Sequence, residues 1–204
     1  RIFVECDTIK FHPLSNRNLV FPAIYRLLYG CGLRISEALA LKQKDVDLKQ
    51  GIITIRNAKF KKDRLIPLSP SLTRYLEAYS LKVHPFCIAS DFFFKKKDQT
   101  AYAANTMTKN FRHILWKCGI SHGGKGRGPR LHDLRHTFAV HSLNQLIQQG
   151  MDIYCALPIL STYLGHASVA ATERYVRLTE EAYPGILEAV NRTCSYVFPA
   201  VKVK

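Results

Sequence analysis

Membrane-spanning runs, signal peptides and paired cysteines are all missing from this chain of 204 residues. No apolar run approaches the ~18–20 residues that a transmembrane helix needs, and no stretch has the pattern of a signal peptide. The six cysteines are scattered without a Cys-x-x-Cys pair, which argues against a disulfide framework or a zinc ribbon. We therefore expect a soluble protein of the reducing cytoplasm, with Cys31 and Cys118 buried in helices.

Acidic residues are also scarce. The chain has 15 acidic residues against 30 lysines and arginines, a formal net charge of +15 at pH 7. Such an excess concerns the partners of a protein rather than its fold, and a polyanion such as double-stranded DNA is the partner it favours. Ribosomal binding, membrane-surface binding or an inert basic surface would show the same charge, so charge alone does not decide between them.

The pattern of apolar residues predicts a mainly helical domain. Hydrophobic residues make up 47% of the sequence, which is enough for one core. Spacings of three and four residues predict helices, and short β-branched segments predict strands. The predicted helices span 19–31, 36–41, 69–81, 105–118, 131–150 and 158–164, with one more carrying Tyr175; the predicted strands span 51–56 and 64–68, with a brief edge strand at 91–94. Pro22 is expected in the first turn of its helix, where proline is tolerated. The fold class is therefore mainly α with a small antiparallel β-sheet (α+β).

One stretch, from Leu131 to Phe138, combines a buried helical stripe with two polar side chains on another face. His132 and Arg135 are three residues apart and therefore project together. A guanidinium can bind two phosphate oxygens, and an imidazole can donate or accept a proton near neutral pH. The stretch therefore predicts a phosphate site.

Three further segments carry polar residues that could complete this site. Arg34 follows two glycines that interrupt a helix, so it lies at a turn between two helices where a side chain is held in place. Lys59 lies in a basic segment between the two predicted strands. His166 follows a Leu-Gly pair, and Tyr175 comes nine residues later on a helix that Ser168 can cap.

These segments, in their order, resemble the tyrosine recombinase (phage integrase) family. The resemblance rests on Gly-x-Arg-x-Ser-Glu at 32–37, a lysine before Arg-Leu-Ile-Pro-Leu at 64–68, His-Asp-Leu-Arg-His at 132–136, Leu-Gly-His at 164–166 and a downstream tyrosine. It covers roughly residues 19–180, and the ordered set is far more specific than any single piece. The resemblance implies the catalytic-domain fold of that family and a DNA strand transferase that needs no metal or cofactor. It also implies a covalent link between protein and DNA.

The residues suit that chemistry on physical grounds. Displacing a phosphodiester oxygen places negative charge on the equatorial oxygens, and Arg34 and Arg135 can hold those oxygens in place of a metal. His166 would donate to the same oxygens. The resemblance gives His132 a part in proton transfer with the tyrosine and makes Tyr175 the nucleophile.

A lysine is a suitable proton donor to the leaving 5′-oxygen if its pKa is lowered. When the strand at 64–68 is aligned with the family pattern, Lys59 falls at the position of the family's lysine. Lys61 and Lys62 are close in sequence and remain alternatives.

Other charged residues receive supporting roles. Glu37 is expected to pair with an arginine, and Asp133 to be a helix-start carboxylate. A further set of basic residues is expected to contact DNA phosphates without sequence preference. They are Lys61, Lys62, Lys95, Lys96, Lys97, Lys125, Arg127 and Arg130.

The expected organisation has three parts. Residues 1–16 are expected to be a linker or the remnant of a missing N-terminal DNA-clamping domain, and 17–183 the catalytic domain. Residues 184–204 form an apolar tail that could be exchanged between protomers, since family members commonly exchange such a segment. The resemblance implies a bacterial or phage-encoded protein near the nucleoid, acting as a tetramer on DNA to integrate or excise a phage or mobile element.

Three alternatives stay open. A type IB topoisomerase shares the chemistry, and a catalytically silent DNA-binding module could share the fold. A zinc hydrolase would use His132 and His136, whose i, i+4 spacing is close to a metalloprotease helix. That reading lacks the glutamate base, and Arg135 between the histidines would repel the metal.

Overall fold

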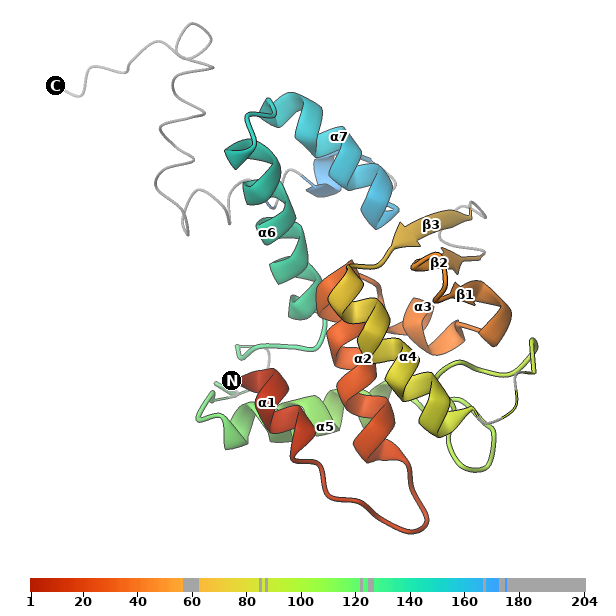
Figure 1. Ribbon diagram of the computed structural model, residues 1–204. Coiled ribbons are helices and arrows are strands. Elements are labelled where there is room, and N and C mark those ends of the chain that lie inside the picture. Colours follow the sequence, from red (N-terminus) through yellow and green to blue (C-terminus); the bar gives the residue numbers. More distant parts are fainter. Residues whose placement is uncertain are drawn as a thin grey trace, which may run out of the picture. The chain divides into compact units, whose positions relative to one another are not determined.

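The computed structural model describes residues 1–56, 63–84, 86, 88–121, 123–124, 127–166, 168–172 and 175. The chain divides into two compact units, residues 1–136 and 137–204, and the boundary lies inside one helix. The elements of the first unit are α1 (Ile2–Asp7), α2 (Arg17–Cys31), α3 (Ile35–Ala40), the 3-10 helix η1 (Gln43–Asp45), β1 (Val46–Asp47), β2 (Ile52–Ile55), β3 (Arg64–Pro67), α4 (Pro70–Val83) and α5 (Ala104–Lys117) (Figure 1). Helix α6 (Asp133–Gln148) begins in the first unit, and α7 (Ile153–Leu164) belongs to the second. The predicted class, mainly α with a small antiparallel β-sheet, is confirmed.

The sheet has three antiparallel strands in the order β1-β2-β3. Ile53 of β2 is paired with Ile66 of β3, and both side chains are fully buried. The alternation of buried and exposed residues along β2 and β3 gives the sheet one apolar face, as the two predicted strands require. In the same register Ile55 pairs with Arg64, which places Arg64 at the start of β3.

The predicted edge strand at 91–94 is wrong. Phe92 forms only an isolated bridge with Lys42, while Phe93 and Phe94 are buried in the first unit. A short aromatic run can be apolar because it fills a core, without belonging to a ladder of hydrogen bonds.

Helix α2 packs against α1, α3 and α4. The hydroxyl of its buried Tyr25 donates to the carbonyl oxygen of Met107 at 2.9 Å, which ties α2 to α5. The helix begins at Arg17, two residues earlier than predicted, so Pro22 lies in the second turn and the expectation for the first turn is wrong. The missing N–H of Pro22 removes one helical hydrogen bond.

Residues 1–16 contain a helix that the sequence pattern did not predict. Helix α1 packs against α2 and α5, and its Cys6 is buried. Ion pairs add to this packing, with Glu5 Oε1 at 2.9 Å from Lys117 Nζ and Asp7 Oδ2 at 2.6 Å from Arg26 Nη2. Residues of this segment are therefore part of the packed first unit.

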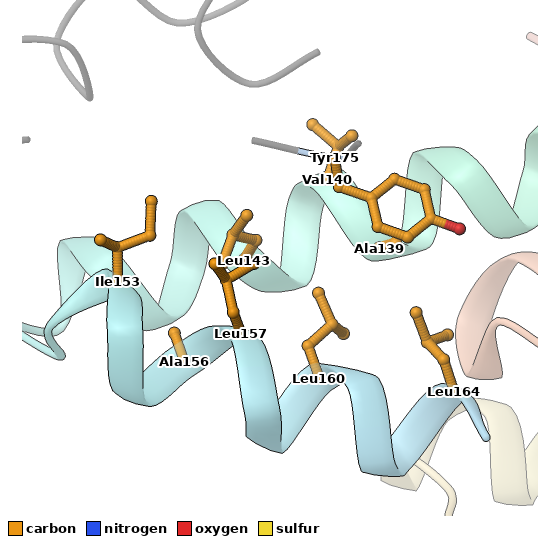
Figure 2. Packing of buried hydrophobic residues seen from close by; sticks show 9 residues of the cluster. All are labelled: Ala139, Val140, Leu143, Ile153, Ala156, Leu157, Leu160, Leu164 and Tyr175. Atoms are coloured by element: carbon orange, nitrogen blue, oxygen red, sulfur yellow. The ribbon is translucent and has the colours of Figure 1, made fainter. Parts of the chain in front are cut away.

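The second unit is built on α6 and α7, which run antiparallel and bury one apolar cluster between them (Figure 2). Its members are Ala139, Val140, Leu143, Ile153, Ala156, Leu157, Leu160, Leu164 and Tyr175. Helix α7 begins at Ile153, five residues before the predicted start at Pro158, because the Asp152 carboxylate accepts from the Tyr154 N–H at 2.8 Å. The helix ends at Gly165 in the left-handed conformation, with φ 66°, as the sequence predicts.

In the part of the chain that the structure describes, no helix has both the length and the apolar character that crossing a bilayer requires. Cys31 and Cys118 are buried free thiols, as predicted, and Cys6 is a third. Burial raises the pKa of Cys6 and of Cys31 to about 12, so both stay protonated at neutral pH.

Candidate active site

Arg34 is held at a tight turn between two helices. Gly32 ends α2 in the left-handed conformation, with φ 60°, and Arg34 is the N-cap of α3. The backbone N–H of Arg34 donates to Glu37 Oε2 at 2.8 Å, and its Nη1 donates to Glu37 Oε1 at 2.8 Å. The local sequence therefore fixes both the backbone and the guanidinium of Arg34.

Glu37 also accepts two hydrogen bonds from Arg64, at 3.1 Å from Nη1 to Oε1 and 2.9 Å from Nη2 to Oε2. Burial raises the pKa of the Glu37 carboxyl, but the hydrogen bonds from Arg64 and Arg34 outweigh burial and hold the pKa below its usual value. Glu37 is therefore ionised at neutral pH. The expectation that it pairs with an arginine is confirmed, and Arg64 is a second partner that the sequence did not reveal.

Arg135 lies in the first turn of α6 and is 1% exposed. Its Nη1 donates to the carbonyl oxygen of Gly32 at 2.6 Å. A buried guanidinium is tolerated only with hydrogen-bond partners, and this carbonyl is one of them. The bond brings Arg135 to the turn that carries Arg34, so the first unit gathers two of the predicted site arginines around residues 32–34.

His132 lies just before α6. Its ring contacts that of His136 edge-on, with 4.7 Å between ring centroids. Partial burial, followed by the nearby His136 and Arg135, lowers the pKa of His132 from its usual value of 6.5. The ring is therefore neutral at pH 7 and able to accept a proton.

Asp133 is the first residue of α6, as predicted. Its Oδ2 accepts from the Arg130 N–H at 2.8 Å, and its Oδ1 lies 3.2 Å from Arg130 Nη2. A carboxylate at this end of a helix stabilises it, so the role of Asp133 is structural.

The second unit holds His166 and Tyr175 together. Their rings are stacked, with 6.0 Å between centroids and 20° between planes. His166 Nδ1 is 2.8 Å from the hydroxyl of Thr172, which is fully buried. Tyr175 is 3% exposed and is part of the cluster that α6 and α7 bury (Figure 2). Thr172, which the sequence did not single out, thus fixes the ring of His166.

Lys59, the predicted proton donor, lies outside the described residues, as do Lys61, Lys62 and Lys125. The remaining predicted phosphate contacts differ in exposure. Arg127, Arg130 and Lys97 are exposed, whereas Lys95 is buried with its Nζ 2.8 Å from Asp91 Oδ2. A buried lysine paired in this way is poorly placed to reach a phosphate.

The zinc reading needs a third ligand beside His132 and His136. Among the described residues, no three histidine, cysteine or acidic side chains gather as a metal site would require. Elemental analysis of the purified chain, together with activity in a chelator, distinguishes that reading from a metal-free one.

The chain belongs to the phage integrase family, which it matches over residues 1–182. A putative integrase/recombinase of Sinorhizobium fredii, y4rB, is 33% identical over 179 residues, covering 86% of this chain and 57% of that protein. The tyrosine recombinase XerA of Thermococcus kodakarensis is 34% identical over 162 residues, covering 78% of this chain and 51% of that protein. This chain thus spans about half the length of these relatives.

Solved structures agree on the fold. A crystal structure of XerA recombinase superposes with a TM-score of 0.66 at 24% identity, covering 98% of this chain and 62% of that one. The site-specific recombinase XerH, in a pre-cleavage complex with its difH substrate, gives a TM-score of 0.65 at 25% identity, covering 89% of this chain and 49% of that one. The predicted tyrosine recombinase catalytic-domain fold is therefore confirmed.

Proposed function

We propose that this chain is the catalytic domain of a site-specific DNA recombinase or integrase. It would cleave and rejoin a DNA strand through a covalent 3′-phosphotyrosine intermediate. The observation that carries the proposal is the buried Arg135, whose guanidinium is anchored to the turn that presents Arg34. Two arginines held at one turn, in a chain of this family with a net charge of +15, suit the binding of a DNA phosphate.

The arginines would stabilise the negative charge that develops on the equatorial oxygens of the phosphate as the tyrosine attacks. A guanidinium held before the reaction needs no reorganisation during it, so its stabilisation is largest in the transition state. His166 would add a hydrogen bond from Nε2 to the same oxygens. His132 would take the phenol proton, a role that its neutral ring suits.

Tyr175 would be the nucleophile. A phenol ester of phosphate keeps the energy of the broken bond, and the phenolate can later leave again. Because Tyr175 is almost fully buried, a phosphate can reach its hydroxyl only after the surrounding packing has opened. Lys59 would protonate the leaving 5′-oxygen, with Lys61 and Lys62 as alternatives.

A nicked suicide DNA duplex tests the proposal. Loss of the short fragment next to the nick prevents religation, so a covalent protein–DNA adduct should accumulate without added magnesium. A recombinase also needs a synapse of two sites, whereas a topoisomerase relaxes a single duplex. An adduct without recombination between two candidate sites would favour the topoisomerase reading.

The proposed partners are double-stranded DNA and further protomers. XerH is known bound to its difH substrate, and a lambda integrase dimer bound to a core site. We further propose a tetramer on DNA, with residues 184–204 exchanged between protomers and residues 1–16 as a linker or the remnant of an N-terminal DNA-clamping domain. Action on a phage or mobile element would place the protein at the nucleoid in the cytoplasm.

The pH dependence of cleavage should report on His132. Its lowered pKa keeps the ring neutral down to below pH 6.5, so cleavage should persist there and fall only as the ring is protonated. Because the folded chain binds this proton less readily than the unfolded chain, the neutral ring of His132 favours the folded state above pH 6.5. This contribution to the free energy of unfolding is lost as pH falls through the lowered pKa.

Single-turnover rates against pH, for the natural chain and for His132→Gln, measure this effect. The substitution should lower the plateau about 10²-fold and remove the acid limb. An acid limb centred above pH 6.5, or one that survives in His132→Gln, would assign the titration to another group.

Thr172 should matter through His166. A neutral imidazole that donates from Nε2 carries no hydrogen on Nδ1, so Nδ1 is then a hydrogen-bond acceptor. The hydroxyl of Thr172 can donate a hydrogen bond to it. Thr172→Val keeps the branched shape but removes the hydroxyl, so cleavage should fall about tenfold, the equivalent of one hydrogen bond of ~1.4 kcal/mol.

Thr172→Ser is the matched control, since it keeps the hydroxyl and should stay within about twofold of the natural rate. Nitrogen NMR of the imidazole follows the tautomer of His166 directly. Equal rates and unchanged ring signals in Thr172→Val would show that the hydroxyl has no effect on the ring.

A further inference from the structure

Arg64 lies at the start of β3 and has no role in the reaction as proposed above. Its side chain is 12% exposed, and its Nη1 and Nη2 both donate to Glu37. Its Nε is buried without a hydrogen-bond acceptor. The guanidinium is therefore directed at Glu37, the same carboxylate that holds Arg34.

One carboxylate thus lies between two guanidiniums. Glu37 is 10% exposed, and the Arg34 side chain is 27% exposed. Each carboxylate oxygen accepts two hydrogen bonds, one from Arg64 and one from Arg34. The three charges sum to +1, whereas Arg34 and Glu37 alone would sum to zero.

We propose that Arg64 is a positioning residue, which shares the charge of Glu37 so that Arg34 keeps its positive charge available for a DNA phosphate. The inference rests on the proposed function. A carboxylate with a single arginine partner in a poorly solvated place binds that partner strongly. Without Arg64, Glu37 would compete with the phosphate for Arg34. With Arg64 present, two of the four hydrogen bonds that Glu37 accepts come from Arg64 and only two from Arg34.

Removing the charge of Arg64 and removing the charge of Glu37 should therefore have opposite effects on Arg34. Arg64→Met keeps an apolar stem but leaves Glu37 to Arg34 alone, so cleavage should slow about 10- to 100-fold. Arg64→Lys keeps the charge and should stay within about threefold of the natural rate. Glu37→Gln in the Arg64→Met background removes the competing charge and should recover most of the lost rate.

Single-turnover cleavage of a nicked suicide duplex by the 204-residue chain and these variants tests the inference, with Arg74→Met, an exposed arginine of α4, as control. Thermal unfolding checks each variant. If Arg64→Met does not fold, Arg64→Lys and the double variant, which removes both buried charges, still decide.

A slow Arg64→Met, a fast Arg64→Lys and a recovered double variant support charge sharing. An Arg64→Met that cleaves at the natural rate overturns it. The proposal is also overturned if the double variant cleaves no faster than Arg64→Met and Arg64→Lys is slow, because Arg64 would then act only by holding the fold. If the natural chain itself forms no adduct, it is the proposed function that fails.

Discussion

Replacing Tyr175 with phenylalanine should abolish the covalent adduct with a nicked DNA duplex, with a loss of at least about 10⁴-fold. The substitution removes only the hydroxyl that would attack phosphorus. The ring remains to pack in the cluster with Val140, Leu143 and Leu160, so the fold should be retained (Figure 2). DNA affinity should stay nearly unchanged, since it depends on phosphate contacts made by arginine and lysine.

The adduct is measured by its slower migration in a denaturing gel and located by peptide mapping. Tyr163→Phe is the matched control, because this ring also packs against the same cluster but is not the proposed nucleophile. It should form the adduct at close to the natural rate. An adduct that persists in Tyr175→Phe would assign the attack to another residue and overturn the site as proposed.

Replacing Arg135 with lysine should slow cleavage by about 10²–10³-fold, although the charge is kept. Lysine cannot bind two phosphate oxygens in one plane, and it cannot at the same time hold the Gly32 carbonyl as the guanidinium does at 2.6 Å. Loss of this buried bond should also lower the free energy of unfolding, by about 1–3 kcal/mol.

The two effects are separated by measuring cleavage with saturating DNA at a temperature where denaturant titration shows the variant folded. Arg74→Lys serves as control, because Arg74 is an exposed arginine of α4 that has no proposed part in the reaction. It should change the rate less than about threefold. If Arg135→Lys cleaves as fast as Arg74→Lys, then Arg135 supports the fold without stabilising the transition state.

Regular periodicity made much of the fold predictable. The five apolar residues at 107, 111, 114, 115 and 118 repeat at helical spacing, and all are buried along α5 and its C-cap. Gly32 and Gly165 end helices in the left-handed conformation, as glycines after a periodic segment predict. Such features depend on neighbours in sequence and need no knowledge of the tertiary structure.

Elements without such local signals escaped prediction. Helix α1 lies in a segment of mixed composition without an apolar period, and β1 has only two residues, too few for a period to show. The start of α7 was misplaced because Pro158 resembles a first-turn proline, whereas the helix is begun by the Asp152 cap and accommodates the proline in its interior. Here tertiary packing of an apolar face outweighs the local cost.

The residues of the candidate site likewise fall into those that local sequence predicts and those that it does not. Arg34, His132, Arg135 and His166 are found by short motifs, because each motif is a local device such as a turn or a helix start. Their partners come from elsewhere in the chain. Arg64 lies 27 residues from Glu37, and the Gly32 carbonyl 103 residues from Arg135, so neither contact can be inferred from spacing.

A crystal structure of the chain trapped on cleaved DNA tests the central claim most directly. We expect guanidinium nitrogens of Arg34 and Arg135 and Nε2 of His166 all to lie within ~2.7–3.2 Å of oxygens on one phosphate, whose phosphorus is bonded to Tyr175. Side chains of these residues on different phosphates, or a phosphate linked to another residue, would contradict it.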